Sequence, residues 1–175
     1  MTKSEIEKEF SKGDLRGKGG VDNVLKEYSK DKKVRKDIFD LIFSENRIIA
    51  MRAIDAYEKI SKNSNVTEEE QSQLLSILGT PKHKEFMWHY VQILGYMEIP
   101  NGIKDQVYNY LKEAINDYLD SNIVRVFAMQ TMYNLFITNE KYRKEIRGVL
   151  GDMAKSSIPS LQSRAMKLLK LYNKV

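Results

Sequence analysis

Apolar residues recur along this chain at spacings of three, four and seven, which place their side chains on one face of an α-helix. Four segments share one register of this kind, at residues 48–60, 85–97, 123–135 and 160–172. In each segment a large apolar residue stands at position two, and most residues at positions six, ten and thirteen are also apolar. The pattern therefore predicts four helices that bury equivalent faces.

The four segments are evenly spaced along the chain. Their fifth residues, Arg52, His89, Phe127 and Arg164, follow one another at intervals of 37, 38 and 37 residues. No stretch alternates apolar and polar residues as a half-buried strand does. Another apolar helical stretch precedes each segment, at residues 35–43, 68–78, 103–115 and 142–154. The repeating unit is therefore a helical hairpin of about 37 residues, a period typical of solenoid proteins.

Local signals mark the ends of these helices. Thr67, with Glu70 three residues later, forms a capping box at the start of the second hairpin. Pro81 and Pro159 fall in the breaks between paired helices, where the residue before each proline disfavours helical backbone. We therefore expect short loops to connect the helices within each pair.

One segment carries a family resemblance. The stretch DSNIVRVFAMQTMYNL resembles the second helix of a HEAT repeat, and Asp120, Val124, Arg125 and Ala128 match its pattern. The other units keep the apolar spacing but hold Ala50, Met87 and Gln162 where Arg125 stands. The resemblance covers residues 36–173. It implies an all-α fold, a right-handed α-α superhelix of four HEAT-like hairpins related to armadillo and HEAT solenoids.

The rest of the chain is expected to cap this solenoid. Residues 1–35 would form an N-terminal cap and a basic, glycine-rich link, so that residues 1–175 make a single domain. The link, GDLRGKGG at 13–20, invites comparison with a phosphate-binding loop. Only three residues separate Gly13 from Gly17, Gly19 replaces the hydroxyl residue after Lys18, and a charged helical segment precedes the link. We therefore interpret it as a connection between helices.

Composition narrows the class of protein. The 175 residues include 42% hydrophobic and 30% charged residues, as in a globular protein, and no cysteine. No apolar run approaches the roughly 18 residues of a membrane span, and the start of the chain lacks the apolar stretch of a signal peptide. We expect a cytoplasmic protein that needs no cofactor. The net charge of +5 is concentrated at the two ends of the chain, which favours at most weak, nonspecific contact with nucleic acid.

In a solenoid of this kind the second helices line the concave surface, so their non-core positions are expected to face a partner. The central units place aromatic side chains at these positions, and the outer units place charged ones, an arrangement typical of protein-binding surfaces. The predicted partner-binding residues are Arg52, Asp55, Trp88, His89, Gln92, Tyr96, Phe127, Gln130, Tyr133, Arg164 and Lys167. These positions predict a non-catalytic scaffold that binds another protein or peptide.

An enzyme is the main alternative. The two histidines, His83 and His89, lie six residues apart, on different helical faces, and do not supply a zinc site. Some HEAT-like proteins bind DNA or remove alkylated purines with an aromatic residue, a carboxylate and an arginine. Trp88 and Arg125 resemble two of these, but Gln92 stands where an acid would be needed to stabilise the cationic transition state. A DNA-binding or DNA glycosylase relative therefore stays the second interpretation, and the oligomeric state is left open.

Overall fold

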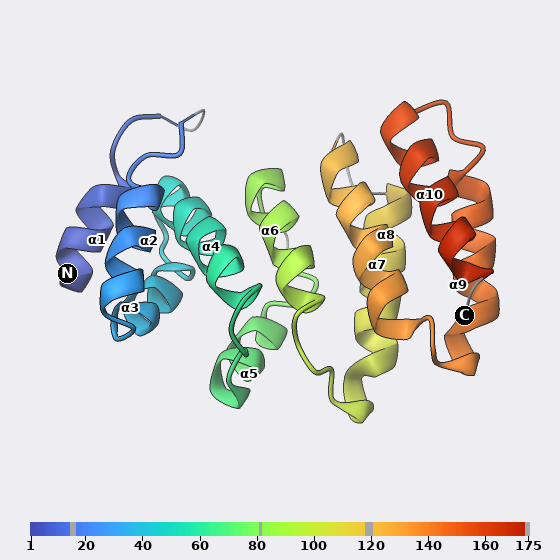
Figure 1. The fold of residues 1–175 in the computed structure, drawn as a ribbon, viewed down its shortest axis with the longest axis horizontal. Coiled ribbons are helices and arrows are strands. Elements are labelled where there is room, and N and C mark those ends of the chain that lie inside the picture. Colours follow the sequence, from blue (N-terminus) through green and yellow to red (C-terminus); the bar gives the residue numbers. More distant parts are fainter. Residues whose placement is uncertain (15–16, 81, 118–120, 174–175) are drawn as a thin grey trace. The chain divides into compact units, whose positions relative to one another are not determined.

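The computed structural model describes residues 1–14, 17–80, 82–117 and 121–173. Within these ranges the chain forms ten α-helices and a short 3₁₀ helix and no strand, which confirms the all-α prediction (Figure 1). Four residues used in the sequence predictions, Leu15, Arg16, Pro81 and Asp120, lie outside the described residues. The helices are α1 Lys3–Phe10, α2 Val21–Lys30, α3 Val34–Leu41, α4 Arg47–Ser61, α5 Glu68–Ser76, α6 Lys84–Leu94, η1 Asn101–Ile103, α7 Lys104–Asp117, α8 Asn122–Phe136, α9 Glu140–Met153 and α10 Pro159–Tyr172.

All eight helices expected from the repeat are present, as α3 to α10. The second and sixth positions of the four repeat segments are buried in every unit, from Ile49 and Ala53 to Leu161 and Ala165. The side chains of Leu135, Leu169 and Tyr172, at the tenth and thirteenth positions, are only half-buried. The chain divides into two compact units, Met1–Gln73 and Leu74–Val175. The single domain expected over residues 1–175 stays a prediction.

In the first unit, α4 is the central helix and packs against α1, α2 and α3. Ala53, Ile54 and Tyr57 of α4 are fully buried, as are Ile6 and Phe10 of α1. The helix α1 begins with a capping box, because the hydroxyl of Thr2 accepts from the N–H of Glu5 and the Glu5 carboxylate accepts from the N–H of Thr2. The helices α1 and α2 thus both pack on α4, and the N-terminal cap stays a prediction.

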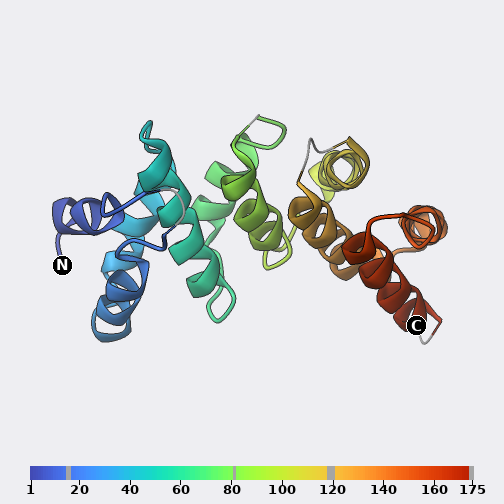
Figure 2. The same cartoon turned by 90° about the horizontal axis from the view of Figure 1, so that it is seen from above.

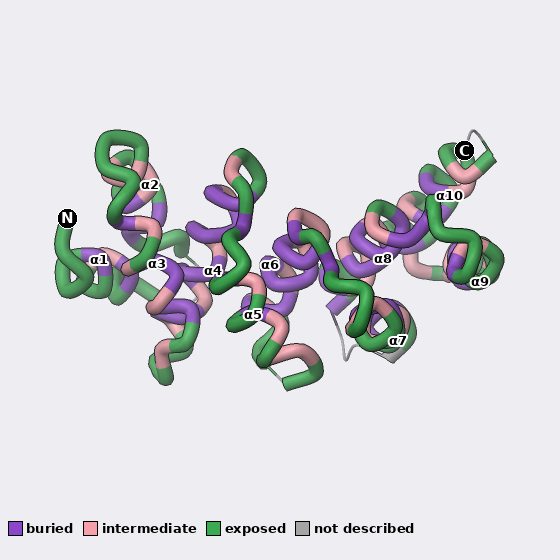
Figure 3. The backbone as a smooth tube through the Cα atoms, turned by 90° about the horizontal axis from the view of Figure 1, so that it is seen from below, coloured by how far each residue is buried: buried purple, intermediate pink, exposed green. Residues whose placement is uncertain are grey.

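In the second unit, α8 is the central helix and packs against α6, α7, α9 and α10. Figure 2 shows α8 between α6 and α10, with α7 and α9 seen end-on beside this row. The Thr131 hydroxyl donates to the carbonyl of Val91 at 2.8 Å and so ties α8 to α6. Buried residues, purple in Figure 3, run along α8 from Val124 to Phe136. This packing of successive second helices is that of a helical solenoid.

The described residues of the glycine-rich segment lie between α1 and α2, and Arg52 of α4 anchors them. One terminal nitrogen of Arg52 donates to the carbonyls of Phe10 and Lys12, and the other to those of Asp14 and Gly17 at 2.5 and 3.1 Å. The segment lies so close that a Cβ on Gly19 would stand 2.5 Å from Cζ of Arg52. Its backbone carbonyls therefore serve as ligands for a guanidinium rather than its amides for a phosphate.

Adding a methyl group at Gly19 tests whether this segment lies close to Arg52. Gly19 has a φ of +51°, which side chains rarely adopt, and it contacts the guanidinium of Arg52. We expect Gly19→Ala to lower the free energy of unfolding by about 1–3 kcal/mol, measured by urea denaturation. Gly17→Ala is the matched control, because its Cβ would meet only the Gly19 amide nitrogen at 4.0 Å. Equal stabilities of the two variants would contradict the contact.

Candidate functional site

The second helices of the second unit form one surface. Because α8 packs against both α6 and α10, the outward positions of these three helices are neighbours. We call this surface the α6–α8–α10 face. Its side chains are half-buried or exposed, and they include six residues predicted from the sequence and one that was not, Ile123. The face consists of Trp88, Gln92, Ile123, Phe127, Gln130, Arg164 and Lys167.

Aromatic rings link the helices across this face. The rings of Trp88 and Phe127 are stacked, with centroids 6.2 Å apart and planes inclined by 23°. The guanidinium of Arg164 lies 6.0 Å from the centroid of the Phe127 ring, within the range of a cation–π interaction. Phe127 therefore lies between the indole of Trp88 on α6 and the guanidinium of Arg164 on α10.

Amide side chains hold the cation in place. Arg164 donates from Nη1 to Oε1 of Gln130 at 2.6 Å, and Gln130 donates from Nε2 to Oδ1 of Asn134 at 2.8 Å. Gln92 donates to the carbonyl of Trp88, one turn earlier on α6, at 3.3 Å. The polar groups of the face thus orient one another, while Trp88, Phe127 and Arg164 are half-buried.

Ile123 was missed by the sequence analysis. Its side chain is 41% exposed, although it is large and apolar. It lies one turn before Phe127 on α8, so the two side chains occupy adjacent positions of one stripe. The signal was present, because the stripe 123, 127, 130 and 134 follows helical spacing, but position 123 opens the repeat segment and was not counted among the outward positions.

Three residues predicted on the concave surface are buried instead. Arg52 is only 1% exposed, because the glycine-rich segment covers it, while Tyr133 is 7% and His89 is 8% exposed. Tyr133 is buried because α8 has helices on several sides, which leaves a narrow outward stripe. The expectation that these side chains are exposed is wrong for all three.

Two further predicted residues differ in their setting. Tyr96 lies beyond the end of α6, because the helix ends at Leu94 and Gly95 forms its C-cap. Asp55 lies on α4 in the first unit, where its carboxylate pairs with Lys59 one turn later at 2.9 Å. Neither belongs to the α6–α8–α10 face.

Arg125, the arginine that matches the HEAT-repeat pattern, makes contacts inside the unit. Arg125 donates from Nε to the carbonyl of Ile115 at 2.6 Å and so joins α8 to the end of α7. Its terminal nitrogen also lies 3.7 Å from the sulfur of Met153 on α9. The guanidinium therefore satisfies a helix C-terminus and is directed away from the α6–α8–α10 face, which removes it from any site built around Trp88.

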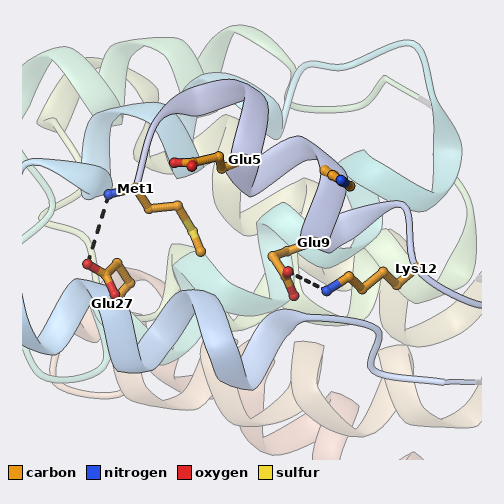
Figure 4. A pocket seen from close by; sticks show the side chains of 6 residues that line it. Met1, Glu5, Glu9, Lys12 and Glu27 are labelled. Carbon is orange, nitrogen blue, oxygen red and sulfur yellow. Dashed lines mark hydrogen bonds and ion pairs between the residues drawn. The ribbon is translucent and has the colours of Figure 1, made fainter.

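Charged side chains line two cavities in the first unit. One, of about 500 Å³, lies between α1 and α2 and is lined by Met1, Glu5, Lys8, Glu9, Lys12 and Glu27. Figure 4 shows two ion pairs among these residues, the amino terminus of Met1 with Glu27 and Lys12 with Glu9. The carboxylates of Glu9 and Glu27 are thus neutralised by groups of the chain itself, and that of Glu5 accepts from the N–H of Thr2.

The other cavity, of about 400 Å³, has Arg35 and Glu70 in its wall. Arg35 donates to Glu70 from Nε and Nη2 at 2.8 and 2.7 Å. Burial acts to lower the pKa of Arg35, but the bonds to Glu70 and Tyr57 outweigh it, so that the net shift of this pKa is upward. This pair is a structural bond between α3 and α5 and is not available to a ligand.

No helix within the described ranges is both long and apolar enough to cross a membrane. A family model described as a HEAT repeat domain matches residues 13–172, which is nearly the whole chain. Comparison with curated proteins and with solved structures gives no match.

Proposed function

Because the chain belongs to the HEAT repeat family, we propose that it is a non-catalytic protein-interaction module that binds a partner through the α6–α8–α10 face. HEAT repeats commonly mediate contacts between proteins. The observation that supports this particular face is the stack of Trp88 on Phe127 beside the guanidinium of Arg164. Tryptophan, tyrosine and arginine are the side chains that contribute most to binding energy at protein interfaces, and phenylalanine is enriched at the cores of interfaces.

The setting of Phe127 supports the same proposal. The ring is half-buried, held on two sides by Trp88 and Arg164, and so needs little ordering when a partner binds. A side chain that is already ordered loses less conformational entropy on association. The exposed apolar surface of Ile123 extends this ring by one helical turn, so that a partner can bury both side chains together.

The binding proposal predicts that removing the apolar centre of the face abolishes partner capture. We expect Ile123→Ala combined with Phe127→Ala to reduce the recovery of specific partners from a native lysate more than tenfold, quantified by mass spectrometry. The fold should persist, because neither side chain is fully buried, and circular dichroism checks it. Asn109→Ala, at an exposed position of α7, is the matched control. Equal recovery with both variants would refute this face as the binding site.

The DNA alternative leads to a separate prediction. Residues 140–173 hold eight basic and three acidic side chains, which can attract phosphates without base recognition. We expect a labelled duplex to bind weakly and to dissociate by about 150 mM salt, where the Debye length is about 8 Å. We expect no release of methylated purine, because Arg125 is bonded to the carbonyl of Ile115 and Gln92 replaces an acid. Release that disappears with Trp88→Ala would instead identify a glycosylase.

A further inference from the structure

We infer that the partner of the α6–α8–α10 face is an acidic peptide segment that carries a bulky apolar side chain beside its carboxylates. This inference rests on the proposed function and specifies the chemistry of the partner. Its basis is the combination, on one face, of cations that pair with no carboxylate among the described residues and of exposed apolar side chains that flank them.

The charge of the face has one sign. The helices α8 and α10 contain no Asp or Glu and four basic residues, Arg125, Arg164, Lys167 and Lys170. Arg125 is directed inward to the carbonyl of Ile115, so the accessible cations of these two helices are all on α10. The acid of α6, Glu85, lies in the first turn of that helix. The surface formed by α8 and α10, which has fixed positive charge and no acid of its own, attracts an anionic partner and repels a basic one.

Arg164 is the best-defined of these cations. Its interactions are with the ring of Phe127 and with the amide oxygen of Gln130, both of them neutral. Within the described part of the chain, no carboxylate pairs with it or with Lys167. A guanidinium has five N–H donors in a planar fork, and only one of these is used by Gln130. The fork is thus held in position for a carboxylate, which it binds with two parallel hydrogen bonds.

The apolar component of the partner follows from the neighbours of this fork. Phe127 lies directly under the guanidinium, and Ile123 is one turn away along α8. On α10, Leu171 is 40% exposed and lies seven residues after Arg164, on the same side of the helix. A carboxylate on Arg164 therefore brings the adjacent residues of a peptide over an apolar surface. This surface favours a peptide over a nucleic acid, whose backbone offers phosphates but no aliphatic side chain.

Selection from a random peptide library tests the inference without assuming a partner. The full wild-type chain is immobilised and used to select phage-displayed 16-residue peptides. Two parallel selections use double variants instead, one with Ile123→Ala and Phe127→Ala and the other with Arg164→Gln and Lys167→Gln. We expect the wild-type pool to be enriched in Asp and Glu next to Phe, Leu or Trp. The affinity of the recovered peptides is measured by fluorescence anisotropy. They should bind the double variant with Arg164→Gln and Lys167→Gln at least about tenfold more weakly than they bind the wild type.

The matched control removes two other cations from the same hairpin. Lys144 and Lys155 are exposed and lie outside the face, so Lys144→Gln with Lys155→Gln should change the affinity less than about twofold. Changing the Asp and Glu residues of a selected peptide to Asn and Gln should reproduce the loss seen with Arg164→Gln and Lys167→Gln.

The outcomes separate the two proposals. Enrichment that depends on Ile123 and Phe127 but selects neutral or basic peptides would refute the acidic partner and leave the binding face intact. Enrichment that does not depend on these two residues, or no enrichment, would overturn the proposed function together with the inference. A DNA duplex that displaces the selected peptides at physiological salt would assign the face to nucleic acid and would also overturn it.

Discussion

Arg52→Met is expected to destabilise the first unit by about 3–5 kcal/mol, the largest effect of any single substitution considered for this chain. Arg52 is 1% exposed, and its guanidinium donates to the carbonyl of Phe10 at the end of α1 and to three carbonyls of the segment between α1 and α2. Hydrogen bonds to a charged group each contribute about 1.5–3 kcal/mol. Methionine fills part of the volume but donates to none of the carbonyls, which are left against an apolar side chain.

The same substitution should free the segment locally. We expect trypsin to cleave after Lys12 and Lys18 at least tenfold faster in Arg52→Met than in the wild type, because the carbonyls on both sides lose their anchor. Arg52→Lys keeps the charge but replaces a planar fork by a single ammonium group, so an intermediate loss is expected. Urea denaturation measures the stability, and mass spectrometry identifies the cleavage sites. An unchanged unfolding midpoint together with unchanged cleavage would show that the anchor does not stabilise the unit.

The burial of Arg52 could not be predicted from the sequence. The repeat spacing placed it at the same position as Phe127 and Arg164, and its helix was predicted correctly. A periodic pattern assigns a side chain to a helical face, but it does not reveal what covers that face. The covering segment lies about 40 residues away along the chain, and its contacts with Arg52 run through backbone carbonyls, which every sequence possesses. The residue types of GDLRGKGG do not indicate such a contact.

The eight helices of the repeat were predictable for the opposite reason. Helical hairpins depend on local spacing, and the residues that fill the core recur at fixed positions, so that Val124 and Leu161 are buried as their spacing predicts. The face itself was only partly predictable. The repeat spacing directs Phe127 and Arg164 outward, and both are half-buried, but their contact depends on the packing of α8 against α10. The burial of Tyr133 likewise depends on the number of helices around α8.

The capping box at α5 is a local motif that also binds a residue far away in the sequence. Thr67 and Glu70 exchange the two expected hydrogen bonds, from the N–H of Thr67 at 2.8 Å and from the N–H of Glu70 at 3.3 Å. The same carboxylate also accepts two bonds from Arg35, 35 residues earlier. The motif was confirmed, but the arginine could not have been identified from the sequence, because many basic residues in that region could have taken the same position.

Loss of this arginine has the second largest expected effect. Arg35→Met should lower the free energy of unfolding by about 3 kcal/mol at pH 7, the lower end of the range for breaking a buried ion pair. The side chains of Arg35 and Glu70 are 18% and 12% exposed. Arg35 also donates to Ser64, to Tyr57 and to the carbonyl of Asn65, so it connects α3 to α4, α5 and the loop between them.

An exposed pair provides the control for this prediction. Lys36 neighbours Arg35 on α3, and its ammonium lies 3.5 Å from Asp40, but its side chain is 77% exposed. Exposed pairs of this kind contribute about 0.3–0.5 kcal/mol. Lys36→Met should therefore change the unfolding free energy by less than about 0.5 kcal/mol. Similar losses for Lys36→Met and Arg35→Met would show that burial of the ion pair is irrelevant.

The pH dependence distinguishes the ion pair from simple packing. Burial acts to raise the pKa of Glu70, but the hydrogen bonds from Arg35 and from the N–H of Thr67 outweigh it, so that the net pKa lies below the ordinary value of 4.5. The stability from this depressed pKa is therefore present above pH 4.5 and is lost as the pH falls through the pKa of the folded state. We expect the difference in unfolding free energy between the wild type and Arg35→Met, followed by circular dichroism in urea, to be largest near pH 7 and to shrink below pH 4. A difference that stays constant from pH 7 to pH 3 would assign the loss to the packing of the aliphatic stem of Arg35 rather than to its charge.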